Sequence, residues 1–157
     1  MKTRFAETKD IDKILALLVQ VNMVHHKARL DLFKGPTTKY SKRQLESMLD
    51  DLENPIFVAV NDKDVVLGYA FCQTEQAIND PLRTAVKTLY LDDLCVDELC
   101  RGQHVGRALY QQVLDFAKTH GYYNVTLHVW AGNTQAEQFY AAQGMTTQYR
   151  CLEQIVG

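Results

Sequence analysis

The sequence predicts a mixed α/β fold within a single domain that spans residues 1–157. Three observations predict this class. Apolar residues recur at helical spacing twice within the first third of the chain, and runs of β-branched and aromatic residues follow in the middle. In the second half, strand-like runs lead through short turns into further helical patterns. With 46% hydrophobic and 23% charged residues, the composition is that of an ordinary globular domain and excludes general disorder.

Two helices are expected in the first third of the chain. The first begins within residues 8–10. Its apolar stripe consists of Ile11, Ile14, Leu15, Leu18 and Val21. Residues 22–40 are expected to be irregular, because a Gly-Pro pair within them interrupts any helix. Ser41 and Gln44 match a capping box, which begins the second helix, and Pro55 ends that helix.

The middle of the chain changes to the pattern of strands. Residues 56–60 and 65–73 are rich in β-branched and aromatic side chains, and the polar residues 61–64 between them indicate a hairpin. After a polar stretch, residues 89–96 predict another strand, which is unusual because it carries two adjacent carboxylates among apolar residues.

Strand–turn–helix units are expected in the second half. The turn at residues 101–107 leads into a third amphipathic helix, which Gly121 ends. Residues 125–129 predict a strand, and residues 131–133 turn into a short fourth helix. Residues 149–155 have the composition of a last strand.

Charge and hydropathy exclude several classes of protein. Seventeen basic against nineteen acidic residues give a net charge of -2, which disfavours binding to nucleic acid through phosphate neutralisation. No apolar run reaches the ~20 residues of a membrane helix, and the first residues lack the apolar core of a signal peptide. We therefore expect a cytoplasmic protein that does not enter membranes. The four cysteines lack paired metal-ligand spacing, so we expect reduced thiols and no metal site.

The turn Arg101-Gly102-Gln103-His104-Val105-Gly106-Arg107 is the most informative segment. A glycine-containing turn that enters a helix presents free N–H groups and the positive end of the helix dipole, which together suit a pyrophosphate. The alternative is an ordinary strand–helix junction whose glycines only permit the turn. The segment matches neither a P-loop nor a dinucleotide-binding fingerprint.

Two motifs resemble those of the GCN5-related N-acetyltransferase (GNAT) superfamily. Residues 101–106 resemble its signature Gln/Arg-x-x-Gly-x-Gly/Ala, and residues 133–145 resemble its element Asn-x-x-Ala-x-x-Phe-Tyr-x-x-x-Gly-Phe. The resemblance implies the GNAT-like fold, which is a mixed, mostly antiparallel twisted sheet of about six or seven strands flanked by about four helices. His104 departs from the signature because it stands where the family usually has its first glycine, and this puts the geometry of the loop in question.

The resemblance also implies an activity. The protein would be an acetyl-CoA-dependent N-acetyltransferase that acts on a primary amine of a small molecule, with polyamine-like amines as one class, or of a protein. The alternative is an acyl-CoA-binding regulatory domain without turnover, which a panel of amine acceptors would distinguish. Homodimers are common in the superfamily, although no feature of this sequence specifies one.

The family's site residues carry over to matching positions. The backbone N–H of Leu94 would face the acyl carbonyl on a strand that splays from the next, and Leu94, Cys95 and Val96 would pair with the pantetheine arm. Residues 101–107 would hold the pyrophosphate. Tyr140 would protonate the leaving thiolate, or alternatively only anchor its helix by packing. Asn133 would contact the pantetheine region, cap the helix, or do both.

The adjacent carboxylates Asp92 and Asp93 are the candidate bases. Neighbouring strand residues face opposite sides, so only one of them is expected to point into a given cleft. Burial favours the neutral form of a carboxyl and suits it to accept a proton. The run Leu-Asp-Asp-Leu-Cys-Val is similar to Leu-Glu-Asp-Phe-Phe-Val of the diamine acetyltransferases, which makes Asp92 the first candidate and Asp93 the second. The alternative is a carboxylate in a surface salt bridge.

Overall fold

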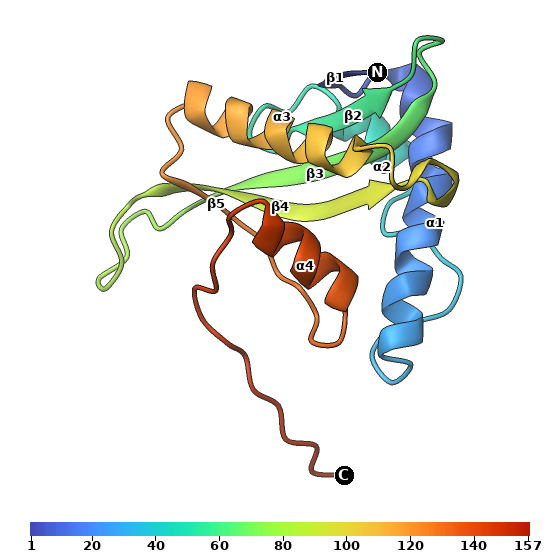
Figure 1. Ribbon diagram of the computed structural model, residues 1–157. Helices are drawn as coiled ribbons and strands as arrows, with labels where there is room; N and C mark the ends of the chain where they lie inside the picture. Colours follow the sequence, from blue (N-terminus) through green and yellow to red (C-terminus); the bar gives the residue numbers. More distant parts are fainter.

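A five-stranded sheet in the order β1-β2-β3-β4-β5 organises the protein, and the computed structural model describes residues 1–157. The strands are β1 Lys2–Phe5, β2 Ile56–Val60, β3 Val66–Gln76, β4 Lys87–Val96 and β5 Asn124–Thr126. All neighbouring strands are antiparallel except β4 and β5, which are parallel (Figure 1). The mixed, mostly antiparallel sheet confirms the predicted fold class, with five strands where six or seven were expected.

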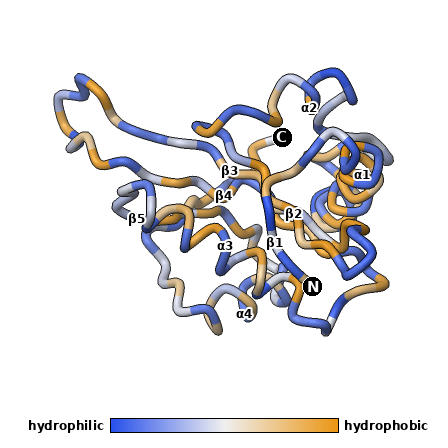
Figure 2. The backbone as a smooth tube through the Cα atoms, turned by 90° about the horizontal axis from the view of Figure 1, so that it is seen from above, coloured by the Kyte–Doolittle hydropathy of each residue, from blue (hydrophilic) through white to orange (hydrophobic).

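Helices cover both faces of the sheet and create two cores. They are α1 Ile11–Ala28, α2 Lys42–Met48, α3 Val105–Thr119 and α4 Thr134–Ala142. Seen from above, α1 and α3 lie on opposite sides of the sheet (Figure 2). The core on the α1 side includes Ile11, Ile14, Leu17, Leu18, Leu45, Val58, Tyr69 and Phe71. The core on the α3 side includes Phe57, Ala70, Leu89, Leu91, Val105, Leu109 and Val113.

The predicted helix boundaries are confirmed except at the ends of α1 and α2. Helix α2 ends at Met48, so Pro55 does not end it, and the residues between them form turns in which Asp51 accepts hydrogen bonds from the N–H of Glu53 and the side-chain amide of Asn54. The capping box of α2 is present, because Ser41 Oγ accepts from Gln44 N and Gln44 Oε1 accepts from Ser41 N at 3.3 and 2.8 Å. Helix α1 continues through residues 22–28, which were expected to be irregular. The Gly-Pro pair lies too far along the chain to stop α1, which ends at Arg29, where the backbone leaves the helical region.

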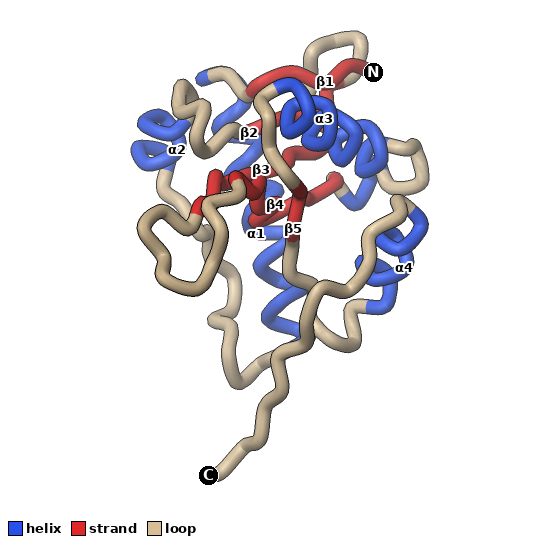
Figure 3. The backbone as a smooth tube through the Cα atoms, turned by 90° about the vertical axis from the view of Figure 1, so that its left-hand side faces the viewer, coloured by secondary structure: helices blue, strands red, loops and turns tan.

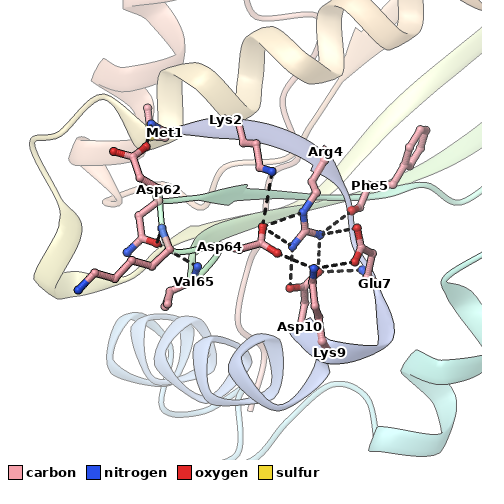
Figure 4. A network of polar contacts seen from close by, with 12 residues as sticks. Met1, Lys2, Arg4, Phe5, Glu7, Lys9, Asp10, Asp62, Asp64 and Val65 are labelled. Atoms are coloured by element: carbon pink, nitrogen blue, oxygen red, sulfur yellow. Dashed lines mark hydrogen bonds and ion pairs between the residues drawn. The ribbon is translucent and has the colours of Figure 1, made fainter.

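The strand β1 was not predicted from the sequence, because its four residues alternate between charged and other side chains without an apolar run. Arg4 fixes β1 to the start of α1 and to the β2–β3 turn (Figure 4). Its guanidinium bonds Asp10 at 2.6 Å and Asp64 at 3.2 Å, and Asp10 is only 2% exposed. These long-range ion pairs place β1 at one edge of the sheet.

The expected strand at residues 149–155 is absent. The chain after α4 has no regular structure, and it extends away from the domain (Figures 1 and 3). No backbone–backbone hydrogen bond involves residues 146–157. The prediction of a strand is wrong here, because a strand forms only where a neighbouring edge accepts its hydrogen bonds, and this segment lies against none within the chain.

Gly68 of β3 lies where the backbone of β4 leaves no room for a side chain. A Cβ atom added there would lie 2.6 Å from the carbonyl oxygen of Cys95 and 3.1 Å from a methyl of Leu109. We expect Gly68→Ala to lower the free energy of unfolding by about 1–3 kcal/mol, because neither the backbone nor the core can yield without strain. Denaturant unfolding measures the effect.

Gly35→Ala is the matched control for this substitution. A Cβ atom at Gly35 would have only His26 Nε2 nearby, at 3.9 Å. The unfolding free energy of this variant should stay within about 0.5 kcal/mol of the parent. Equal stability of the Gly68 and Gly35 variants would contradict the close approach of β3 and β4.

Candidate functional site

A β-bulge in β4 creates the centre of the site. In the register with β3, Phe71 lies opposite Asp93 whereas the next residue, Cys72, lies opposite Leu91. Asp92 is therefore the extra residue of the bulge. The two carboxylates consequently line the same cavities, and the expectation that only one would point into the cleft is wrong. The alternation of faces holds for a regular strand, and the bulge interrupts it.

The bulge also determines which face of the sheet the side chains of the next residues reach. Leu94 packs toward the core on the α3 side and lines a cavity, whereas Cys95 belongs to the core on the α1 side. Val96 packs again toward α3. The thiol of Cys95 is buried against the carbonyl oxygen of Leu17 at 3.6 Å, and burial raises its pKa to about 12. A cofactor beside β4 can therefore meet Cys95 only through its backbone.

Strands β4 and β5 separate just before the bulge. Their pairing ends where Tyr90 meets Thr126, so residues 91–96 have no strand on the β5 side. A cavity opens in this gap, and we name it the strand cavity. Its walls include Leu91, Asp92, Asp93, Leu94, Leu127, His128, Trp130, Asn133 and Tyr140. The splayed strands expected from the family resemblance are thus present, and unpaired backbone of β4 faces the cavity.

A second cavity of about 310 Å³ lies between α1 and the segment before α2, and we name it the loop cavity. Its walls include Leu18, Val21, Asn22, His25, Phe33, Thr37, Thr38, Lys39, Asp92 and Asp93. Val21, His25 and the two carboxylates line both cavities. The strand cavity and the loop cavity therefore adjoin at Asp92 and Asp93, and two reactants could meet there from opposite sides.

Asp93 is a largely buried carboxylate with one strong hydrogen bond. Tyr69 donates its hydroxyl to Asp93 Oδ2 at 2.8 Å. Burial raises the pKa of Asp93 to about 6, although the bond from Tyr69 opposes the shift, and the negative charge of Asp92 raises it further. A carboxyl with this pKa is mostly ionised near pH 7 and binds a proton more tightly than an ordinary carboxylate, which is what a general base requires.

Asp92 is paired within the chain. Lys39 donates its ammonium to Asp92 Oδ2, and the same ammonium lies 5.5 Å above the ring of Tyr40. Burial lowers the pKa of Lys39, but the bond to Asp92 outweighs it and holds the pKa above its usual value. The pKa of neighbouring His25 is lowered by burial and by the charge of Lys39, so its ring is neutral near pH 7.

Tyr140 lies on the wall of the strand cavity opposite β4. Its ring packs against those of Tyr110 and Phe139, with centroids 6.0 and 5.0 Å away. Burial raises the pKa of Tyr140 well above the usual value, and the charge of Asp93 adds to this. The hydroxyl therefore stays protonated through the physiological range and can donate a proton.

Asn133 caps α4, because its Oδ1 accepts from Ala136 N at 3.3 Å, and it also lines the strand cavity. The cavity thus brings Asp92, Asp93 and Leu94 of β4 together with Asn133 and Tyr140, which lie 39 to 48 positions further along the chain.

The turn at residues 101–107 lies at the N-terminus of α3, outside both cavities. Gly102 and His104 have φ of 77° and 62°, so the chain passes through the left-handed region twice before the helix begins. Val105 is buried and anchors the helix, whereas Arg101, His104 and Arg107 are exposed. His104 thus adopts the left-handed conformation that the family's glycine would favour. The free backbone N–H groups of the turn remain at the start of α3.

Sequence reasoning missed three residues of the site: Lys39, His25 and Tyr69. Lys39 and Tyr69 act through partners that are distant in the sequence, Asp92 and Asp93, and His25 lines both cavities. None of the three lies in a recognisable motif. Their importance follows from the bulge, which turns both carboxylates toward α1. The structure places no group of three His, Cys, Asp or Glu side chains for a metal ion, and no helix has the length and apolarity to cross a bilayer.

Solved structures share the whole fold. The BH1408 protein of Bacillus halodurans is 27% identical with a TM-score of 0.93, and the match covers 99% of each chain. Glucosamine-6-phosphate N-acetyltransferase of Arabidopsis thaliana is 20% identical with a TM-score of 0.72, covering 99% of this chain and 98% of that one. The second likeness concerns the fold alone, because the identity is low.

Sequence comparisons extend the likeness to a family. YjaB of Salmonella typhimurium, a peptidyl-lysine N-acetyltransferase, is 30% identical over 105 residues, which are 66% of this chain. The chain spans 59% of the length of that curated relative. The model of the acetyltransferase (GNAT) family matches residues 22–145, which include β4, the turn before α3 and α4. The protein therefore belongs to the GNAT acetyltransferase family.

Proposed function

We propose that the protein transfers an acetyl group from acetyl-CoA to a primary amine. One observation carries this proposal: a carboxylate with a pKa of about 6 and a protonated tyrosine line one cavity between splayed strands. Acyl transfer to an amine needs a base for the ammonium, a donor for the carbonyl oxygen and an acid for the leaving sulfur. The residues around the strand cavity provide a group for each need.

Acetyl-CoA would supply the acyl thioester, and this chain offers residues that fit its parts. The unpaired β4 edge at Leu94, Cys95 and Val96 offers backbone groups to the amide-rich arm, with Asn133 across the cavity. The turn at residues 101–107 offers N–H groups and two exposed arginines to the phosphates. The cofactor site in this proposal is thus the one expected from the sequence.

We assign the base to Asp93 in preference to Asp92, which reverses the order that the sequence favoured. Asp93 has the raised pKa of a base, whereas Asp92 already accepts a hydrogen bond from Lys39. Asp93 takes the proton of the acceptor ammonium, directly or through a water molecule. The N–H of Leu94 donates to the carbonyl oxygen, and the hydroxyl of Tyr140 gives its proton to the leaving sulfur.

The acceptor amine enters through the loop cavity in this proposal. Lys39 neutralises Asp92, so a single uncompensated carboxylate, Asp93, faces an incoming ammonium. This charge balance favours an amine with one positive charge near the reacting nitrogen, such as a lysine side chain or a small monoamine, over a polyamine. The name of the Salmonella relative, which acts on peptidyl-lysine, supports the same class.

A panel of acceptors tests the proposed function and its alternative. Acetyl-CoA is incubated with the protein and with lysine-containing peptides, small monoamines, aminoglycosides or polyamines, and products are detected by mass spectrometry. We expect one acetyl group on a peptide or monoamine and an equal amount of free CoA. Binding of CoA without transfer to any amine would instead favour the non-catalytic acyl-CoA-binding domain.

His104 offers a test of the cofactor turn. His104→Gly is expected to keep the affinity for CoA within about threefold, or to tighten it, because glycine adopts the left-handed conformation without strain. Isothermal titration with CoA measures the change. Loss of CoA binding in a folded His104→Gly protein would show that the imidazole itself contacts the cofactor.

A further inference from the structure

Lys39 carries the only ammonium or guanidinium group in the walls of the two cavities. Its ammonium donates a hydrogen bond to Oδ2 of Asp92, which lines both cavities, so the positive charge lies beside the place where the cavities adjoin. The proposed acyl transfer needs a base, a hydrogen-bond donor and an acid, and Lys39 is none of these. Its charge can act instead on which amine enters the site.

The segment that carries Lys39 is fastened to α1. Asn22 of α1 donates its side-chain amide to the carbonyl oxygen of Gly35 at 2.9 Å, and His26 Nδ1 donates to the carbonyl oxygen of Phe33 at 2.7 Å. Residues 29–40 contain no helix or strand, and these bonds hold them at the wall of the loop cavity. Lys39 is thus placed near the bulge before any acceptor binds.

An aromatic ring supports the ammonium of Lys39. The ammonium lies 5.5 Å from the ring centroid of Tyr40, which is within the range of a cation–π contact. The ring of Tyr40 stacks in turn on Phe71 of β3, with centroids 5.6 Å apart, and Phe71 lies opposite Asp93 in the sheet. Thr38 donates its hydroxyl to the carbonyl oxygen of Tyr40 at 2.9 Å, across Lys39. The ammonium is therefore supported by the same pair of strands that carries the two carboxylates.

The charge of Lys39 reaches the other titratable groups around the loop cavity. Burial raises the pKa of Asp93, and the charge of Lys39 acts against this rise. Burial lowers the pKa of His25, and Lys39 lowers it further. With His25 neutral, two carboxylates and one ammonium leave one net negative charge at the site. A single ammonium of an acceptor neutralises this charge, and a second ammonium would find no carboxylate free.

We propose that Lys39 determines which amines the site accepts: its tethered ammonium takes the place of a second substrate ammonium and excludes acceptors that carry two positive charges close together. The proposal rests on the proposed function and assigns its choice of acceptor to one residue. Neighbouring Cα atoms are about 3.8 Å apart, so a short diamine held at Asp93 would bring its second ammonium toward Asp92 and Lys39. Like charges repel at such distances, and specificity of this kind depends on the repulsive group.

The variant Lys39→Gln tests the proposal, because it removes the charge while its amide can still donate to Asp92. The two acceptors are n-butylamine and 1,4-diaminobutane, which have the same carbon chain and differ by one ammonium. The measured quantity is the ratio of kcat/KM for the diamine to kcat/KM for the monoamine. We expect Lys39→Gln to raise this ratio by about 10-fold over the wild type, since the repulsion is gone and Asp92 is free. An unchanged ratio would overturn the proposal.

Two control variants separate the charge from a structural effect. Lys42→Gln removes an ammonium that lies three residues further along and pairs with Asp12 at 3.0 Å, outside both cavities. Its ratio should equal that of the wild type. Lys39→Arg keeps the positive charge and should keep the wild-type ratio as well. A raised ratio in either control would contradict a role for the charge at position 39.

The double variant Lys39→Gln with Asp92→Asn tests where the second ammonium binds. Removing the carboxylate restores one net negative charge at the site, so the ratio should return to about the wild-type value. A gain for the diamine that persists without Asp92 would overturn the proposal, because the second ammonium would then bind elsewhere.

Binding of the diamine separates this proposal from the proposed function. Titration calorimetry with 1,4-diaminobutane in the presence of CoA requires no acetyl transfer, and Lys39→Gln should bind the diamine about 10-fold more tightly than the wild type does. A protein that acetylates no amine and yet shows this gain would contradict the proposed function and support the role of Lys39. A protein that acetylates amines and shows no gain would overturn the role of Lys39 alone.

Discussion

Replacing Tyr140 by phenylalanine is expected to lower kcat roughly 100-fold, in line with the loss of a general acid. The hydroxyl lines the strand cavity, and burial raises its pKa and keeps it protonated, so it holds a proton for the leaving sulfur. The ring remains, so its packing against Tyr110 and Phe139 should survive. The affinity for acetyl-CoA should change little. Steady-state kinetics with the best acceptor of the panel measures the effect.

Tyr110→Phe is the control for this prediction. Tyr110 belongs to the same aromatic cluster and is 4% exposed, but it does not line the strand cavity. Its variant should keep kcat within about twofold. If Tyr140→Phe also stays within about twofold of the parent, the role of Tyr140 is packing and the proton must come from elsewhere.

Asp93→Asn is expected to have the largest effect on turnover, a fall in kcat of about 10²–10⁴-fold, because it removes the base. Asp92→Asn should have a smaller effect on kcat and raise the acceptor KM or leave it unchanged, since Lys39 already compensates its charge. The two variants are matched, because each replaces one carboxylate of the same bulge by an amide. A reversed ranking would assign the base to Asp92.

Asp93→Asn should also stabilise the folded protein. A loss of activity in this variant can then not be attributed to unfolding. The pKa of Asp93 rises from about 3.8 to about 6 in the folded protein, so the native state binds the proton more tightly than the unfolded chain. The wild type therefore loses stability as the pH rises from 4 to 6, by on the order of 3 kcal/mol. Asp93→Asn has no such loss, so it should exceed the wild type in unfolding free energy at pH 8 and approach it near pH 4. A less stable variant at pH 8 would contradict the buried carboxylate.

Much of the fold follows from local sequence signals. The capping box of α2, the helix after the turn at residues 101–107 and the short α4 depend on residues within a few positions of one another, and the structure contains all three. The strand β1 depends on partners far away in the chain, and residues 146–157 form no backbone–backbone hydrogen bond with any other segment. No local pattern can show whether an edge is available to a strand-like segment, as at residues 149–155.

In the candidate site, too, residues marked by local motifs could be predicted and residues that depend on distant partners could not. Leu94, Asn133 and Tyr140 were found because motifs mark them, and they line one cavity. The orientation of Asp92 and Asp93 could not be predicted, because one inserted residue in β4 changes which face each carboxylate reaches. Lys39 is missed for a related reason, since its partner lies 53 positions away.

The pH dependence of kcat/KM tests the central claim most directly, because it reports the base of the free enzyme. For the wild type, kcat/KM for the acceptor should fall below a pH of about 6, the pKa of Asp93 in the folded protein. In Asp93→Asn this acidic limb should disappear together with most of the activity, while Asp92→Asn should retain it. An acidic limb that persists unchanged in Asp93→Asn would contradict the assignment of the base.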